Sequence, residues 1–292
     1  MQVDGGQFLR EADRIEQDLN MSDFSFVLRL IAETFLAIGR NWTVVLRITL
    51  IPLLLPIALL VGWFTWAMKS AYLVHYLPKQ VGGGDEVPVF ALALILIAAI
   101  GTLPVAVAWH RFDLMGEAPR ALWPRLYPGA SFGYFGRSLL LVLIAILFGI
   151  CLMLPMYAFI QNSSTGSLSF SYGALPEPRT AWNFVLSAIY FAALIGLLTR
   201  WSLILPARAL GQSLTLKDSR EAASARLSLK GYFLLGLLLH LFSILLDLLL
   251  AELATGYIGL LLVLPCVLLF QFMFNIALLT RLYGHCVKAP AL

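Results

Sequence analysis

The chain has 292 residues, of which 60% are hydrophobic and only 12% are charged, and its mean hydropathy is +0.87. Because a soluble globular domain carries about 25% charged residues, this composition excludes an ordinary water-soluble fold and indicates a polytopic membrane protein. The net charge is +4 and the sequence pI about 9.0, but no basic stripe carries interleaved aromatic residues, so we expect no nucleic-acid partner.

Residues 1–42 are predicted to form a cytoplasmic tail that ends in an amphipathic helix. The apolar face of this helix recurs at helical spacing and comprises Phe24, Val27, Leu28, Ile31, Phe35 and Ile38. Ser22 or Asp23 can cap the helix and Gly39 can end it. Its other face is charged, so we expect the helix to lie in the membrane plane before the chain turns inward at Trp42. A cytosolic helix docked on the rest of the protein is the alternative.

Six apolar stretches are long enough to cross the hydrocarbon core, which takes about 20 residues in a helix. They lie at about 43–67, 87–109, 138–160, 181–205, 231–254 and 257–280. Because lipid-exposed backbone has to satisfy its own hydrogen bonds, each stretch is predicted to be helical. The predicted fold class is therefore all-α, with a six-helix transmembrane domain over residues 43–283 and a cytoplasmic tail over residues 284–292.

The distribution of basic residues predicts the orientation. With the N-terminus inside, fifteen of the 20 Lys and Arg residues fall in cytoplasmic segments, and only Lys69, Lys79 and Arg179 fall in outer loops. Both termini are therefore expected on the cytoplasmic side. We expect no cleaved signal peptide, because residues 1–20 are polar and acidic and lack a basic segment followed by an apolar stretch.

The ends of the even-numbered spans resemble one another. VAWHRF at 107–112, LLTRWS at 197–202 and LLTRLY at 278–283 each place an arginine near an aromatic residue. Basic residues beside glycine or aromatic residues also precede the odd-numbered spans. The pattern predicts three hairpins, each introduced by a basic surface segment, although anchoring at the membrane interface alone could produce it.

Two segments carry a family resemblance, FSFVLRLIAETFLAIGRNW at 24–42 and RWSLILPARALGQSLTLKDSREAASARLSLKGYFLLG at 200–236. They resemble the six-span membrane domain found at the N-terminus of some bacterial glycerophosphoryl diester phosphodiesterases and in many stand-alone relatives. The resemblance implies a bacterial inner-membrane protein, and such stand-alone relatives mostly have no assigned activity. His110 and Arg111 are followed by Phe112, without an acidic metal-ligand pair, so we do not interpret them as a remnant of the phosphodiesterase motif.

Polar side chains inside the last two spans form the candidate site, because such groups are costly in lipid. His240, Ser243 and Asp247 lie at i, i+3 and i+7 on one face of the fifth span. Gln271 and Asn275 lie at i and i+4 on the sixth, and His240 and Gln271 are predicted at similar depth, where they could hydrogen-bond. Three interpretations stay open: packing contacts between helices, a proton or ion path, and an amphiphile-binding pocket.

Chemistry beyond this site is not expected. The sequence has no phosphate loop, HExxH, GxSxG or aspartate-rich metal motif, so we predict no enzyme, and a membrane-embedded lipid enzyme is a minor alternative. Cys151, Cys266 and Cys286 lie far apart, which favours packing roles and predicts neither a metal nor a cofactor.

The predicted function is that of a non-catalytic scaffold, assembly or envelope-homeostasis component of the bacterial inner membrane. Its predicted partners are membrane lipids and a protein partner or a second copy of the chain. A small transporter or channel that uses the polar residues of the last two spans is the alternative.

Overall fold

The computed structural model describes residues 21–49, 52, 86–119, 127–163, 178–253 and 256–288 of the chain. Within those ranges the chain is helical and has no strand, which confirms the all-α prediction. The elements are α2 (Asp23–Arg40), α4 (Glu86–Met115), α5 (Pro128–Ser163), α6 (Pro178–Trp201), α7 (Ile204–Ala209), α8 (Leu216–Arg226), α9 (Leu229–Leu253), α10 (Gly256–Tyr283) and the π-helical turn η1 (Gly284–Lys288). Residues 42–49 are also helical.

Four helices in the described part of the chain are long and apolar enough to cross a membrane. These segments are Pro128–Cys151, Val185–Ala209, Leu229–Leu250 and Cys266–Val287. They overlap the third to sixth predicted spans, so the chain has the helices of a membrane protein. The second predicted span, 87–109, lies within α4. The first, 43–67, lies mostly outside the described residues, as do the predicted outer loops.

Two of the differences between the helices and the predicted spans occur at prolines. α5 begins at Pro128, well before the expected start of the third span at 138. Proline suits this place because its missing N–H is not needed in the first turn of a helix. α6 ends at Trp201 and the chain restarts as α7 at Ile204, so the fourth predicted span is interrupted. Pro206 lies in the first turn of α7, where it leaves no hydrogen bond unmade.

The ends of α2 follow the capping chemistry of its sequence. The hydroxyl of Ser22 accepts the N–H of Ser25 over 3.3 Å, which confirms one of the two predicted caps. The predicted end at Gly39 is wrong by one residue, because the helix continues to Arg40. Asn41 follows it, and its side chain donates to the carbonyl of Ala37 over 2.9 Å.

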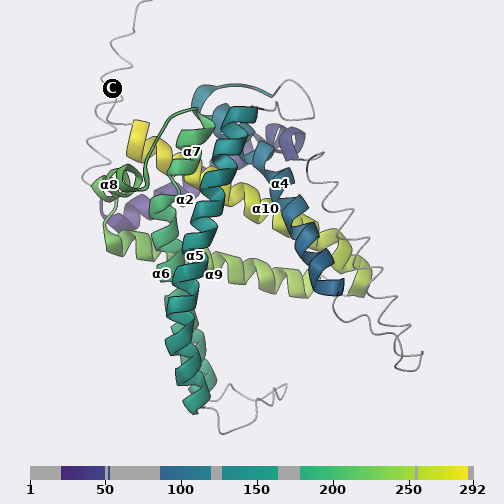
Figure 1. Cartoon of the computed structure of the whole chain (residues 1–292), viewed down its shortest axis with the longest axis vertical. Coiled ribbons are helices and arrows are strands. Elements are labelled where there is room, and N and C mark those ends of the chain that lie inside the picture. The colour runs from purple at the N-terminus through teal and green to yellow at the C-terminus, as the bar shows by residue number, and fades with distance from the viewer. Residues whose placement is uncertain are drawn as a thin grey trace, which may run out of the picture.

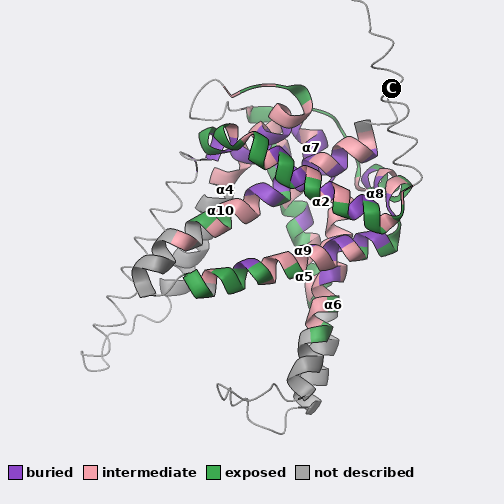
Figure 2. Ribbon diagram, turned by 180° about the vertical axis from the view of Figure 1, so that it is seen from behind, coloured by how far each residue is buried: buried purple, intermediate pink, exposed green. Residues whose placement is uncertain are grey.

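The helices form two arms that diverge from a common junction (Figure 1). α5 and α6 run together as one arm, while α4, α9 and α10 make up the other. α2, α7 and α8 lie at the junction. Buried residues concentrate there, whereas the arms carry mainly intermediate and exposed residues (Figure 2). The junction is therefore where the helices are fixed relative to one another.

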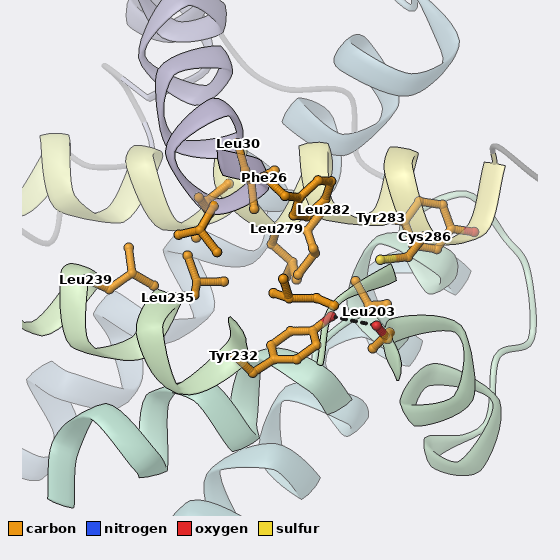
Figure 3. Close-up of a cluster of buried hydrophobic side chains, with 14 of the residues drawn as sticks. Phe26, Leu30, Leu203, Tyr232, Leu235, Leu239, Leu279, Leu282, Tyr283 and Cys286 are labelled. Carbon is orange, nitrogen blue, oxygen red and sulfur yellow. Dashed lines mark hydrogen bonds between the residues drawn. The ribbon is translucent and has the colours of Figure 1, made fainter. Parts of the chain in front are cut away.

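The main hydrophobic cluster lies at this junction (Figure 3). Its side chains come from α2, α9 and α10 and from the segment between α6 and α9 that contains α7 and α8. Phe26 and Leu30 of α2 are buried in it. Tyr232 of α9 is fully buried, and its hydroxyl donates to the carbonyl of Ala223 in α8 over 3.3 Å. Burial of a large apolar side chain stabilises a fold by about 1.5–3 kcal/mol. α2 is therefore part of the folded core and not a loose extension.

α6 and α9 approach so closely that their main chains touch. A Cβ atom on Gly236 would overlap the carbonyl oxygen of Ala192 and lie 2.8 Å from the amide nitrogen of Gly196. A Cβ atom on Gly196 would lie 2.9 Å from the carbonyl carbon of Tyr232. Small residues therefore permit the contact, as they commonly do between helices in lipid.

Replacing Gly236 with Ala should push α9 away from α6 and destabilise the protein by about 1–3 kcal/mol, because main-chain atoms cannot rotate aside. Heating the purified chain in detergent and following the loss of monodisperse protein measures this change. Gly136→Ala in α5 is the matched control, since a Cβ atom there meets nothing within 4 Å and Ala favours a helix by about 1 kcal/mol. Equal midpoints for the two variants would contradict the close main-chain contact.

Candidate functional site

The structure brings together two of the five predicted polar residues. The side-chain amide of Gln271 on α10 donates to the hydroxyl of Ser243 on α9 over 2.8 Å. Both side chains are half-buried. A hydrogen bond between neighbouring membrane helices contributes about 1 kcal/mol, so this contact fits a packing role.

The other three predicted residues lie elsewhere. The ring of His240 stacks on Phe191 of α6, with centroids 5.1 Å apart and 24° between the ring planes. Asp247 and Asn275 are exposed. The amide of Gln271 is directed to Ser243 and the ring of His240 to α6, so the described contacts do not join the five side chains into one polar path.

A histidine that sequence reasoning did not select occupies a buried site between three helices. His110 of α4 is fully buried. Its Nδ1 lies 2.8 Å from the hydroxyl of Thr280 on α10, and its Nε2 lies 3.3 Å from the hydroxyl of Tyr134 on α5. Thr280 already donates to the carbonyl of Ile276 over 2.7 Å. It must therefore accept from the Nδ1–H of His110, and Nε2 accepts from Tyr134.

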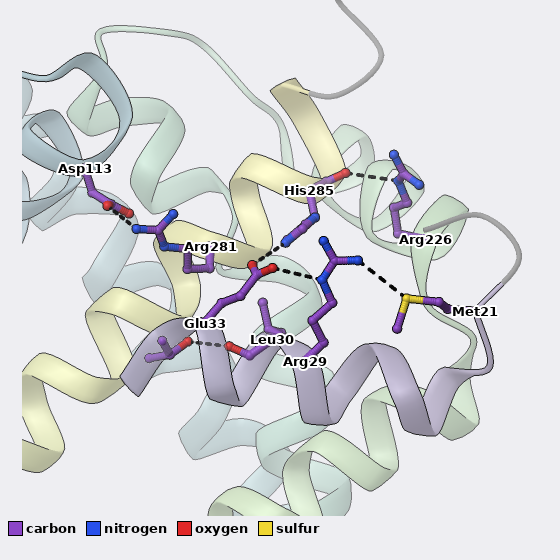
Figure 4. A network of polar contacts seen from close by, with 9 residues as sticks. Met21, Arg29, Leu30, Glu33, Asp113, Arg226, Arg281 and His285 are labelled. Carbon is purple, nitrogen blue, oxygen red and sulfur yellow. Dashed lines mark hydrogen bonds and ion pairs between the residues drawn. The ribbon is translucent and has the colours of Figure 1, made fainter. Parts of the chain in front are cut away.

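Charged side chains at the junction join the first and last described helices (Figure 4). Glu33 of α2 accepts hydrogen bonds from Arg29 Nε and from His285 Nε2 of η1, each over 2.9 Å. Arg226, at the end of α8, donates to the main-chain carbonyl of His285 over 3.0 Å. The turn η1 lies in the predicted C-terminal tail, and these contacts hold it against α2 and α8.

Two further arginine–carboxylate pairs lie at the end of α4. Arg281 of α10 pairs with Asp113 over 2.5 Å. Arg111 pairs with Glu117 over 2.5 Å, and the guanidinium carbon of Arg111 lies 4.1 Å from the centre of the Tyr127 ring. The hydrogen bond to Glu117 raises the pKa of Arg111. The first pair joins the end of α4 to α10, and the second holds the segment after α4 against α4 itself.

The contact between α2 and η1 changes the ionisation of Glu33. The hydrogen bond from His285 is the largest cause, and together with Arg29 it lowers the pKa of Glu33 from 4.5 to about 2. A carboxyl group with a lowered pKa stabilises the fold above its ordinary pKa and ceases to do so as pH falls through the lowered one. The stabilisation from the ionised Glu33 is therefore fully present at neutral pH and is lost as the pH falls from 4.5 to about 2.

These features define a class, a helical membrane protein whose ion pairs gather at one junction of its helices. Within the described ranges no three His, Cys, Asp or Glu side chains gather in a way that could hold a metal ion. No family model matches the chain, and no characterised protein or solved structure shows significant similarity to it. The resemblance to the phosphodiesterase-associated membrane domain therefore stays a prediction.

Replacing Thr280 with Val should leave the Nδ1–H of His110 buried without an acceptor and destabilise the protein by about 1–3 kcal/mol. The two side chains have nearly the same shape, so little packing is lost. Thr34→Val in α2 is the matched control, because Thr34 is equally buried and its hydroxyl donates to the carbonyl of Leu30 in its own helix. Thermal unfolding of both variants in detergent tests the hydrogen bond from His110 to Thr280. Equal unfolding temperatures for Thr280→Val and the control would contradict it.

Proposed function

We propose that the chain is a six-span integral membrane protein of the bacterial inner membrane that acts without catalysis. In this proposal it is a scaffold, assembly or envelope-homeostasis component that works through contacts with lipid and with a partner protein or a second copy. The spans form three hairpins, both termini are cytoplasmic, and the junction of Figure 1 lies at the cytoplasmic side. The resemblance to the phosphodiesterase-associated membrane domain supports a bacterial inner-membrane location.

The observation that carries this proposal is the apolar surface of α5 and α9. Leu143 and Leu147 on α5 are 53% and 56% exposed, and Leu245 and Leu248 on α9 are 61% and 60% exposed. Soluble monomers rarely expose contiguous apolar patches larger than a few hundred Å². Helix faces of this kind suit acyl chains or a helix of another membrane protein.

The charged groups of the junction support a structural role. Glu33, Asp113 and Glu117 each accept a hydrogen bond from an arginine. Asp113 is held by Arg281 of α10 and Glu33 is also held by His285 of η1, so these two carboxylates fix separate elements against each other. A catalytic acid or base instead has to reach a proton of its substrate.

The faces of α2 support a position at the membrane surface. Val27 and Leu30 are buried against the rest of the protein, and Glu33 is directed to η1. Phe24 and Leu28, which are 55% and 44% exposed, lie on the side of the helix away from Glu33. An exposed apolar strip beside a docked face fits the boundary between headgroups and acyl chains. The interfacial and docked interpretations of this helix are therefore compatible.

A small transporter or channel is the second candidate. The hydrogen bond between Ser243 and Gln271 places polar groups between α9 and α10, and Asp247 is an exposed carboxylate within a long apolar helix. Such a residue commonly marks an ion or proton pathway. His240 and Asn275 complete the polar residues that this function would use.

The double variant Asp247→Asn, His240→Phe separates the two candidates. For a scaffold we expect wild-type liposomes to show no more proton or solute flux than empty ones, and the variant to insert and fold normally. Phe can keep the stacking contact with Phe191, so the expected change in stability is about 1 kcal/mol or less. Flux through the wild-type protein that the double variant abolishes at equal incorporation would contradict the scaffold and establish the transporter.

A further inference from the structure

Two arginines from separate elements lie side by side where α5 begins and α7 ends. Arg137 of α5 donates to the carbonyl of Ile204 over 3.0 Å, and Arg208 of α7 donates to the carbonyl of Gly129 over 3.4 Å. Each arginine is thus held by the main chain of the other's element. Their guanidinium groups are close enough to repel each other.

Gly133 makes room for this arrangement. A Cβ atom at this position would overlap the guanidinium of Arg208, whose Cζ would lie 2.7 Å away. The absence of a side chain therefore lets Arg208 rest on the surface of α5. Both arginines are half-buried, so each is held in place while part of its guanidinium stays accessible.

The charge of this pair is not balanced by the described residues. No carboxylate in the described ranges lies within ion-pair distance of Arg137 or Arg208, whereas Arg111 and Arg281 are each paired with one. Two fixed guanidinium groups without a counter-charge favour an anion between them. The planar fork of N–H donors on each group matches the oxygens of a phosphate.

The surroundings favour a phosphate that belongs to a lipid. On the face of α5 that carries Arg137, Leu140 is 40% exposed, and Leu147 and Phe148 further along the helix are 56% and 39% exposed. An acyl chain could lie on this face while its headgroup meets the arginines. We propose that Arg137 and Arg208 together bind the phosphate of an anionic phospholipid. This inference rests on the proposed membrane location of the chain.

Native mass spectrometry of the full chain in a neutral detergent tests the site, with phosphatidylglycerol and phosphatidylcholine of equal chain length added as probes. We expect the wild type to retain phosphatidylglycerol preferentially. Arg137→Gln with Arg208→Gln should weaken this binding by at least about tenfold. The matched control, Lys217→Gln with Arg220→Gln, removes the same charge from exposed positions of α8 and should retain the preference.

A second variant keeps every charge. Gly133→Ala displaces the flexible end of Arg208 without removing an arginine, so it should fold and still lose most of the preference for phosphatidylglycerol. Equal retention of both lipids by the wild type, or equal loss in the α8 control, would overturn the proposal. Binding of inorganic phosphate as tight as that of phosphatidylglycerol would assign the site to free phosphate and also overturn it. A chain that stays soluble without detergent and retains neither lipid would instead refute the membrane location itself.

Discussion

The hydrocarbon core of a bilayer offers no hydrogen-bond partners, and this constraint accounts for where ion pairs form in the described part of the chain. The pairs of Arg111 with Glu117, Arg281 with Asp113 and Glu33 with His285 occur at the junction of the helices. The arms that leave the junction satisfy their main chains as helices and expose apolar side chains such as Leu143 and Leu248. The proposed placement in the membrane follows from this separation, with the junction at the water boundary and the arms in lipid.

Contacts of two kinds fix the helices at the junction. Main-chain contact between α6 and α9 depends on small residues, because Gly196 and Gly236 leave no room for a side chain. Side-chain contacts hold the other elements of the junction together. Among them, the hydrogen bond between Glu33 and His285 joins residues 252 positions apart. Arg111 and Arg281 are paired with carboxylates. Arg137 and Arg208 differ from these two, which is why we assign this pair to a ligand and the others to the fold.

The helices could be predicted from the sequence, but their contacts could not. Long apolar runs predict helices because a single segment in lipid satisfies its main chain only as a helix, and Ser22 is one of two candidate caps because its side chain can accept a main-chain N–H. A helix that is apolar all round carries no signal for the direction in which each face points. The ring of His240 therefore meets α6, although the sequence suggested Gln271 as its partner.

The contacts of the candidate site could likewise not be predicted from the sequence. Gln271 meets a polar residue of α9, but that residue is Ser243 and not the predicted His240. His110 escaped prediction because its partner Thr280 lies 170 positions away, and the similar span endings VAWHRF and LLTRLY that contain the two residues indicate no contact between them. A lone histidine at the end of an apolar run was the only available signal, and it does not name a partner.

The orientation of the junction is the claim on which the proposed function and the lipid site both depend. Fusions of alkaline phosphatase and of green fluorescent protein after Gly84, Ser169 and Ser224 measure it directly, because the first is active outside the inner membrane and the second fluoresces inside. The proposed topology predicts active phosphatase after Gly84 and Ser169 and fluorescence after Ser224. The reversed pattern would place the charged junction outside and contradict this account.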